Sequence, residues 1–301
     1  MTKNILDSIG DTPIIKLDKI NNTNSTILAK LEALNPSGSI KDIMALYMIN
    51  VAEERDTLKP GGKILELTSG NTGISFAMIS SLKGYKFTAV MPASMSKERR
   101  QMMEAFGAEI ILTPEEEGFA GAIKKFEELA KQNPDAWLPR QFDNPDNIAA
   151  HREITARRIL EEVRDRIDAF VCGVGTGGTL MGVAEALKKV YPGAKIVAVE
   201  PEESAVMSGG GPGLHIIQGI GPGFIPGLVN MDMVDKVITV ESDDAVNMTR
   251  GLMREEGLMV GISSGANVLA ALKVAGELGE NKTIVTILPD RGERYLSMDL
   301  F

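Results

Sequence analysis

Short apolar runs rich in β-branched residues recur along the chain, and longer segments with a helical spacing of apolar residues separate them. Runs of this length and composition predict β-strands. Some of them, such as "TIVTIL" near the C-terminus, are apolar at almost every position, which is typical of strands buried on both faces. The predicted strands span residues 26–32, 63–68, 86–92, 109–114, 169–175, 195–201, 237–242 and 283–290.

Helical patterns fill intervals between these strands, for example at residues 72–84, 96–107, 120–132 and 147–166. Alternation of this kind predicts an α/β fold with mostly parallel sheets and helices on both faces of each sheet. Two such blocks follow one another, so we expect two three-layer αβα domains. The smaller domain should span residues 35–145. The larger one should span residues 146–301 together with residues 1–34, which the pattern alone could place with either block.

The composition of the chain disfavours several classes of function. The chain has 301 residues, 44% of them hydrophobic, and a formal net charge of −9. The negative charge disfavours a grip on nucleic-acid backbones, so no nucleic-acid partner is expected. No apolar stretch approaches the ~20 residues of a membrane-spanning helix, and the N-terminus lacks the apolar run of a signal peptide. Cys172 is the only cysteine, which fits a reducing compartment. We therefore expect a cytoplasmic protein without a membrane partner.

The two histidines, His151 and His215, show none of the spacings that metal-binding motifs require. No metal site is expected. A cysteine–histidine hydrolase is also disfavoured, because the chain has one cysteine and its two histidines belong to no recognisable motif.

Three glycine-containing loops follow predicted strands, where open α/β sheets bind ligands. The first, "TSGNTG" (68–73), precedes a helix whose N-terminal N–H groups could hold a carboxylate or a phosphate. It could equally be a turn capped by Ser69 or Asn71. The third loop, 209–226, holds too many glycines and prolines for regular structure, and it is either a mobile cover for a site or a connector.

The second loop, "GVGTGGT" (173–179), contains the spacing G-x-G-x-x-G, and Glu200 ends the next strand where a ribose-binding acid would lie. This combination keeps an NAD-dependent dehydrogenase open as an alternative. Thr176 and Thr179 add hydroxyl groups beside the loop amides, which suits a single phosphate monoester as well as a pyrophosphate.

Lys41 follows a Pro-Ser-Gly-Ser turn and precedes the apolar helical pattern that begins at Ile43. Ser37, Gly38 and Ser39 predict a turn with an N-cap, which puts Lys41 in the first helical turn. The helix dipole disfavours a positive charge there, and burial would lower the pKa of the amine further. A neutral amine is the form that attacks an aldehyde, so Lys41 is either a Schiff-base nucleophile or an exposed surface lysine.

Four motifs help to choose between the two roles of Lys41. They occur along the chain in the order "NPSGSIKD" (35–42), "TSGNTG" (68–73), "GTGGT" (175–179) and "GISSGA" (261–266). Together they resemble the cysteine synthase (O-acetylserine sulfhydrylase) family of fold-type II pyridoxal-phosphate enzymes. The resemblance extends through "IGDTPIIKL", "MPASMSKERR", "FDNPDNIAAHRE", "QGIGPGFIP" and "LPDRGERYLS". It implies a tryptophan synthase β-like fold.

The resemblance also implies a role for each motif. Lys41 would bind pyridoxal 5'-phosphate as a Schiff base, Asn71 would contact the phenolic oxygen of the cofactor, and Ser263 would meet its pyridine nitrogen. The phosphate would lie against Gly175, Thr176, Gly177, Gly178 and Thr179. The substrate α-carboxylate would be held by Thr68, Ser69, Gly70, Thr72 and Gln141.

The chemistry implied by the family is β-replacement. Lys41 removes the Cα proton of O-acetyl-L-serine, acetate leaves to give an α-aminoacrylate, and sulfide adds to give L-cysteine. A neutral hydroxyl at Ser263 makes the ring a weaker electron sink than a carboxylate would, which favours prompt β-elimination. The resemblance further implies a homodimer and, as in some family members, a complex with serine acetyltransferase.

The sequence departs from the family pattern at several positions. Ile43 replaces a usual arginine, "TARRI" (155–159) replaces a usual Thr-Gly-Pro-Glu-Ile, and Arg291 stands where serine is common. Asp232 occupies a position that is not usually acidic. It is either a surface aspartate or a catalytic carboxylate that activates water or a thiol. The departures leave open a second activity, in which L-cysteine is the donor, hydrogen sulfide is released, and a second thiol amino acid can add to give lanthionine or cystathionine.

Overall fold

The larger of two β-sheets forms the centre of the protein. The computed structural model describes residues 4–298, and the larger sheet has the strand order β1-β2-β9-β6-β7-β8. All neighbouring strands are parallel except β1 and β2, which pair antiparallel. The strands are β1 (Ile14–Lys16), β2 (Thr26–Leu31), β6 (Ala169–Gly173), β7 (Lys195–Pro201), β8 (Lys236–Val240) and β9 (Thr283–Leu288).

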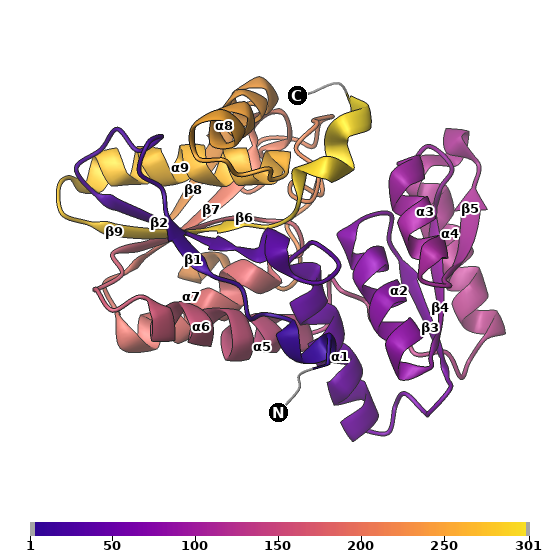
Figure 1. Cartoon of the computed structure of the whole chain (residues 1–301). Coiled ribbons are helices and arrows are strands. Elements are labelled where there is room, and N and C mark those ends of the chain that lie inside the picture. Colours follow the sequence, from indigo (N-terminus) through magenta and orange to yellow (C-terminus); the bar gives the residue numbers. More distant parts are fainter. Residues whose placement is uncertain (1–3, 299–301) are drawn as a thin grey trace.

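Helices cover both faces of this sheet (Figure 1). Helices α8 (Ser242–Glu255) and α9 (Ile262–Leu278) pack on one face, and α6 (Arg157–Glu162) and α7 (Gly178–Val190) pack on the other. The covering explains why the central strands are apolar throughout: every residue of β9 is buried. The order of layers is therefore helix, sheet, helix, as the sequence predicts.

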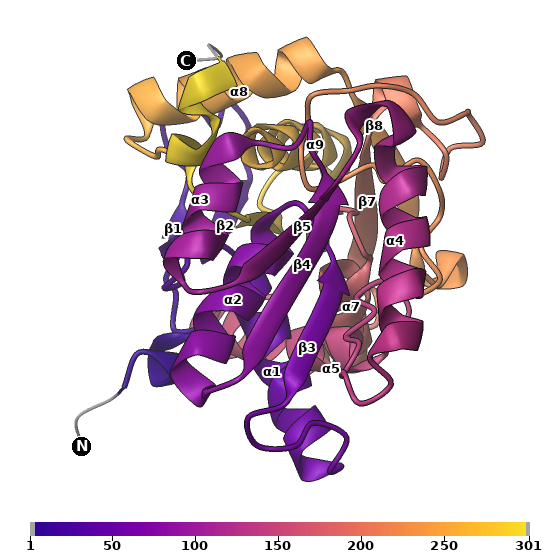
Figure 2. The same ribbon diagram turned by 90° about the vertical axis from the view of Figure 1, so that its right-hand side faces the viewer.

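The smaller sheet consists of three parallel strands, in the order β3-β4-β5. They are β3 (Lys63–Leu67), β4 (Lys86–Pro92) and β5 (Glu109–Thr113). Helices α2 (Asn71–Lys83) and α3 (Lys97–Ala105) lie on one face, and α4 (Gly118–Gln132) lies on the other (Figure 2). This sheet is also a three-layer αβα unit.

Helix α1 (Lys41–Glu54) connects the two units. Ile40 and Ile43, at its start, are buried in the core between the larger sheet and its helices α6 and α7. Met44 and Met48, one turn further on, are buried in the core of the smaller sheet. The isoleucine that replaces a family arginine is thus a core residue, since Ile43 is fully buried.

Eight predicted strands are confirmed, within one or two residues at their ends. The ninth strand, β1, was missed because its three residues are too short to show alternation. The helix predicted at 147–166 is in fact three segments, namely α5 (Asp146–Ala150), a π-helical turn (His151–Ala156) and α6. Residues 209–226 contain no helix or strand, as expected from their glycines and prolines.

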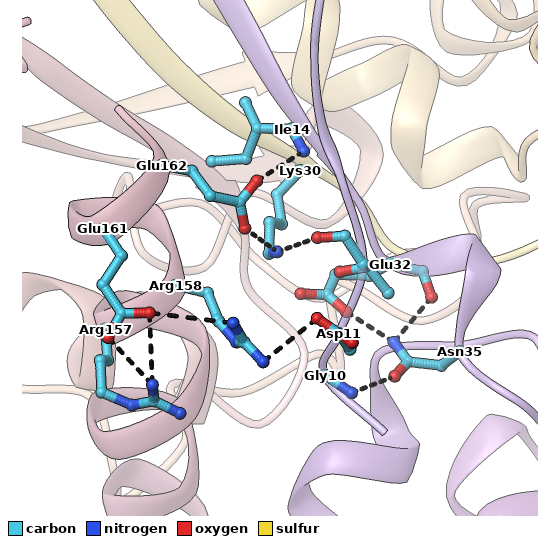
Figure 3. A network of polar contacts seen from close by, with 11 residues as sticks. Gly10, Asp11, Ile14, Lys30, Glu32, Asn35, Arg157, Arg158, Glu161 and Glu162 are labelled. Carbon is cyan, nitrogen blue, oxygen red and sulfur yellow. Dashed lines mark hydrogen bonds and ion pairs between the residues drawn. The ribbon is translucent and has the colours of Figure 1, made fainter. Parts of the chain in front are cut away.

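A polar network ties the N-terminal segment to α6 and to the residues before α1 (Figure 3). Lys30 of β2 is fully buried and pairs with Glu162 of α6 at 3.2 Å. Two residues further on, the carboxylate of Glu32 accepts a hydrogen bond from Asn35, whose own oxygen accepts the N–H of Gly10 at 2.8 Å. The network therefore holds the chain in place just ahead of the turn that leads to Lys41.

Within residues 4–298, none of the helices is long and apolar enough to cross a bilayer.

Candidate active site

Lys41 is the first residue of α1, as predicted. The turn before it passes through Gly38, whose φ of +88° lies in the left-handed region that favours glycine. The N–H of Ile40 donates to the carbonyl of Pro289 (2.8 Å), and the N–H of Arg291 donates to the carbonyl of Gly38 (3.2 Å). The backbone that carries the lysine is therefore fixed against the segment that follows β9.

The predicted serine cap of α1 takes a different form. The N-cap residue is Ile40, and no side chain caps the helix at that position. The Ser39 hydroxyl accepts the N–H of Lys41 at 3.4 Å. The side chain and N–H of Ser37 both donate to the buried carboxylate of Asp42, which also accepts a hydrogen bond from Ser75 at 2.6 Å. Ser37 and Ser75 thus stabilise the turn through Asp42, and neither of them caps the helix.

The surroundings of Lys41 favour its neutral form. Burial lowers the pKa of the amine below its ordinary value, while the neighbouring Cys172 and Asp290 act in the opposite direction. Burial raises the pKa of the Cys172 thiol to about 12, so this thiol is uncharged at neutral pH. Asp290 is then the charged neighbour of the amine. The helix N-terminus adds a positive potential that also disfavours an ammonium group.

The loop 175–179 forms a cup at the start of α7. Gly177 is the N-cap, with a φ of +87°, and no side chain caps the helix. A Cβ atom on Gly178 would lie 2.0 Å from Oδ1 of Asn147, so this position has no room for a side chain. The first N–H groups of a helix lack intrahelical partners and bind anions. With the hydroxyls of Thr176 and Thr179, which line the same cavity as Lys41, they suit a phosphate group.

Two buried side chains support this cup from behind, and the sequence had not indicated either role. Nδ2 of Asn147 donates to Oγ1 of Thr176 and to the carbonyl of Gln141, both at 2.9 Å. Nε2 of His151 lies 3.2 Å from Oγ1 of Thr179, and its Nδ1 lies 2.9 Å from Thr155. Burial lowers the pKa of His151 to about 3, so the ring is neutral and serves as a hydrogen-bonding group.

Asn71 lines the same cavity, and its amide group is fixed at both ends. Nδ2 donates to Oδ2 of Asp290 at 2.7 Å, and Oδ1 accepts a hydrogen bond from Arg294. The hydroxyl of Tyr295 donates to the same Oδ2 at 2.6 Å. Since Nδ2 carries two hydrogens, the one that Asp290 does not use remains for a ligand. The sequence segment "LPDRGERYLS" contains these partners, but no local pattern marks Asp290, Arg294 or Tyr295 as neighbours of Asn71.

Ser263 lies in the first turn of α9 and is buried at the wall of this cavity. Gly261, the N-cap of α9, donates its N–H to the carbonyl of Asp290 at 2.9 Å. The segment 289–291 thus joins the turn before Lys41, the amide of Asn71 and the start of α9. It brings three predicted cofactor contacts into one fixed arrangement.

The predicted carboxylate loop lies at the start of α2. Its N-cap is Gly70, so neither Ser69 nor Asn71 caps the helix as one reading of the sequence had it. Oγ1 of Thr68 instead accepts the N–H groups of Gly70 (3.4 Å) and Gly73 (3.2 Å). No side chain caps α2 at the N-cap position, so N–H groups at its start are available to an anion.

Gln141 joins this loop from a distant part of the chain. Oγ1 of Thr72 donates to Oε1 of Gln141 at 2.7 Å. Glu66, buried on β3, accepts the backbone N–H of Arg140 at 2.8 Å and so holds the Gln141 segment against the sheet. Burial raises the pKa of Glu66 to about 8, although hydrogen bonds from the backbone N–H groups of Arg140, Leu67 and Gln141 lower this pKa in part.

Two neighbouring cavities, which share several lining residues, contain these groups. The first is lined by the cup 175–179, by Asn71, Ser263, Cys172 and Asp290, and by Lys41. The second, of about 300 Å³, is lined by the loop 68–72, Gln141, and again Lys41. The lysine therefore lies where a group bound in the cup and a carboxylate bound in the loop would meet. All predicted cofactor and carboxylate residues line one or both cavities except Gly178, which is buried in the first turn of α7.

Asp232 is not among the residues that line either cavity. It is exposed, in the short 3-10 helix Met231–Met233, where its N–H donates to Oδ1 of Asn230 at 3.1 Å. Val229, three residues earlier, packs against Gly177 of the cup.

Glu200 does not face a ligand as a dinucleotide fold would require. It is buried, and its carboxylate accepts the N–H groups of Met207 (2.8 Å) and Ser208 (2.9 Å) as well as the Ser208 hydroxyl (2.7 Å). A carboxylate committed to its own loop in this way has little capacity left for a ribose. The arrangement disfavours the dehydrogenase alternative.

The set of donors fits pyridoxal phosphate. A neutral amine suits an aldehyde, a cup of N–H and hydroxyl groups suits a phosphate monoester, and a free amide hydrogen and a buried hydroxyl remain for the ring. The family model described as "Pyridoxal-phosphate dependent enzyme" matches residues 5–290. The chain therefore belongs to the pyridoxal-phosphate dependent enzymes, with the tryptophan synthase β-like fold of that family. Within residues 4–298, no group of three or more metal-ligating side chains comes together.

Individual relatives show which members of this family the chain resembles. The chain is 50% identical to a cysteine synthase of Staphylococcus aureus over 300 residues, which cover 99% of this chain and 96% of the relative. The structure of a cysteine synthase from Entamoeba histolytica matches with a TM-score of 0.97 and 45% identity, covering 100% of this chain and 91% of that one. A hydrogen sulfide-producing enzyme from Fusobacterium nucleatum matches with a TM-score of 0.92 and 43% identity, covering 97% and 89%.

Proposed function

We propose that the protein catalyses a pyridoxal-phosphate dependent β-replacement, in which O-acetyl-L-serine or a similar amino acid reacts with sulfide to give L-cysteine. The observation that carries this proposal is the position of Lys41. Its amine, with a lowered pKa, lines both the cavity with the phosphate cup and the cavity with the carboxylate loop. The similarity to cysteine synthases over nearly the whole chain supports the same reaction.

The proposed cofactor contacts follow from the donor set. Lys41 would hold the aldehyde end, the cup 175–179 the phosphate, Asn71 the phenolic oxygen and Ser263 the ring nitrogen. When bound, pyridoxal phosphate supplies an electron sink that makes the Cα–H bond of an amino acid acidic and lets a β-substituent leave. The protein supplies position and protons.

The proposed substrate contacts lie on the other side of Lys41. The N–H groups and hydroxyls of residues 68–72 would bind the α-carboxylate, and Gln141, held by Thr72, would complete the site. A carboxylate held there at a helix N-terminus orients Cα toward the lysine. Lys41 would take the Cα proton as a general base and return it when the product forms, which requires the neutral amine that its surroundings favour.

Ser263 would face the ring nitrogen with a neutral hydroxyl group. A hydroxyl group does not stabilise a protonated pyridine as a carboxylate does, so the cofactor held here would withdraw electrons moderately. This would favour fast loss of a β-substituent. The preference agrees with β-replacement rather than transamination.

Larger-scale features of the family are proposed with the same activity. We propose that residues 35–145 form a small mobile domain, and that residues 1–34 and 146–301 form the large one. Carboxylate binding at α2 would draw the small domain over the site and exclude water. A cytoplasmic location, a homodimer and a complex with serine acetyltransferase are inferred from the resemblance and from the single cysteine.

Two observations favour a second candidate activity, the release of hydrogen sulfide from L-cysteine. The chain is 43% identical to a hydrogen sulfide-producing enzyme, and Asp232 lies three residues after Val229, which packs against Gly177 of the cup. We propose that Asp232 approaches the site only when the small domain closes, since it is exposed and outside both cavities here. It would then activate water or a thiol.

A comparison of two assays tests the function. Product formation is measured from O-acetyl-L-serine with sulfide and from L-cysteine alone, with the wild type, Lys41→Ala and Asp232→Asn. The proposal predicts faster turnover in the first assay, and a loss of about 10²-fold or more in both assays for Lys41→Ala. Asp232→Asn should affect only the second assay. Turnover in the second assay alone would establish the second activity in place of the first.

A further inference from the structure

Arg99 is a buried cation that the proposed function does not use. It lies in the first turn of α3, on the small sheet, and only 9% of its surface is exposed. Among residues 4–298 it takes part in no ion pair, and its Nε has no hydrogen-bond partner. Its guanidinium makes a long hydrogen bond, in which Nη2 donates to the hydroxyl of Tyr295 at 3.5 Å.

A buried guanidinium without a counter-ion is an unfavourable arrangement. Arginine stays protonated in proteins, so burial cannot be relieved by loss of the proton. Part of the charge is balanced by the ring of Tyr295, whose centroid lies 5.6 Å from Cζ of Arg99. Asp290, which shares Tyr295 as a neighbour, already accepts hydrogen bonds from Asn71 and Tyr295 and forms no ion pair with Arg99 among the described residues. The remaining N–H groups of Arg99 therefore lack an anion.

The guanidinium borders a cavity that is large enough to hold an anionic ligand. Arg99 lines the cavity of about 300 Å³ that contains the carboxylate loop and Lys41. A Cβ atom built on Gly70 would lie 3.6 Å from Nη1 of Arg99, so the cation lies directly beside that loop. Sulfide has a single heavy atom, like a water molecule, which takes up about 30 Å³ in the liquid. The cavity therefore has room for reactants much larger than sulfide.

Part of the remaining wall is apolar. Phe119, Phe142 and Pro222 line the same cavity as Arg99. Apolar rings with one cation suit a small organic acid, whose methylene groups contact the rings while its carboxylate meets the planar fork of the guanidinium.

We propose that Arg99 is a carboxylate-binding residue for the amino-acid reactants of this enzyme. The proposal rests on the proposed β-replacement and names the charged group that the site recognises. The carboxylate has two sources. It belongs either to the donor, adding a positive charge to the loop 68–72, or to an acceptor thiol that carries a carboxylate and adds in place of sulfide.

The test uses the holoenzyme with three variants. Arg99→Gln removes the charge, Arg99→Lys keeps the charge without the fork, and Lys97→Gln removes an exposed cation from the same helical turn as a control. With O-acetyl-L-serine as the donor, KM and kcat are measured for three acceptors: sulfide, 2-mercaptoethanol and 3-mercaptopropionate. The last two differ mainly in the carboxylate. Calorimetry with 3-(methylthio)propionate, which has no free thiol, measures binding without turnover.

The expected result is a rise of about ten- to hundredfold in one KM for Arg99→Gln, the size of a lost charge-assisted hydrogen bond. A rise confined to 3-mercaptopropionate, with weaker binding of 3-(methylthio)propionate, assigns the carboxylate to the acceptor. A rise in the KM of O-acetyl-L-serine with every acceptor assigns it to the donor. Arg99→Lys should retain part of the affinity, and it replaces Arg99→Gln if that variant does not fold.

Two results overturn the proposal: every KM and the calorimetric Kd stay within twofold of wild type in the Arg99 variants, or Lys97→Gln changes them equally. If the wild type does not use O-acetyl-L-serine at all, the proposed function fails, and the calorimetric comparison still tests Arg99.

Discussion

Glu32 provides a quantitative prediction about stability and pH. It begins the 3-10 helix Glu32–Leu34 and is fully buried. One carboxylate oxygen, Oε2, accepts a hydrogen bond from Asn35, while Oε1 has no partner. Burial raises the pKa of Glu32 from 4.5 to about 7, although Lys30 and the hydrogen bond from Asn35 lower it in part.

The raised pKa of Glu32 determines whether stability rises or falls with pH. Between pH 4.5 and 7 the folded protein keeps the proton on Glu32 while the unfolded chain loses it, so stability falls as pH rises through this window. The full stabilisation is present below pH 4.5. At about 1.4 kcal/mol per pH unit, the interval between the two pKa values of Glu32 corresponds to about 3 kcal/mol. Glu32→Gln keeps a neutral side chain at every pH and removes this contribution.

The assay is urea denaturation of the apoprotein at pH 4.5 and pH 8. Wild type should lose about 3 kcal/mol more than Glu32→Gln between these two values. Glu161→Gln is the control, because this carboxylate lies on the exposed face of α6 in the same region, paired with Arg157 (Figure 3). Equal pH dependence in wild type and Glu32→Gln would show that Glu32 is ionised at neutral pH, and would refute the reasoning.

Further predictions concern the site. Asn147→Ala removes two buried hydrogen bonds and should lower the free energy of unfolding by about 1–3 kcal/mol, measured by denaturation, with weaker cofactor binding in a spectroscopic titration. Gly178→Ala should also weaken cofactor binding, because its Cβ would lie 2.0 Å from Asn147; unchanged affinity would contradict the tight cup. Asp290→Asn removes a charge that raises the pKa of Lys41, so the pH midpoint for capture of pyridoxal phosphate by the apoprotein should move lower; an upward move would contradict this sign.

The sequence predicted the parts of this protein that local patterns determine. Parallel strands show as apolar runs, and the turn before Lys41 and the cup 175–179 are marked by glycine and hydroxyl residues at the ends of such runs. The resemblance of the four ordered motifs to a known enzyme family then implied which ligands they serve. The position of Lys41 at the start of a helix could be inferred in this way, because a turn and a helical pattern are both local features.

Contacts between distant segments could not be predicted in the same way. Asn71 meets Asp290 and Arg294 across more than two hundred residues, and Arg99 meets Tyr295 across a similar distance. Nothing in the spacing of these residues marks them as partners. The π-helical turn at His151 was also hidden, since its residues have an ordinary helical pattern.

The most direct test of the account is the identity of the lysine that carries the cofactor. The purified protein is incubated with pyridoxal phosphate, reduced with borohydride, digested and analysed by mass spectrometry. The account predicts one modified peptide, with the added mass on Lys41, and a near-visible absorbance band that Lys41→Ala lacks. Modification of a different lysine, or of none, would contradict it.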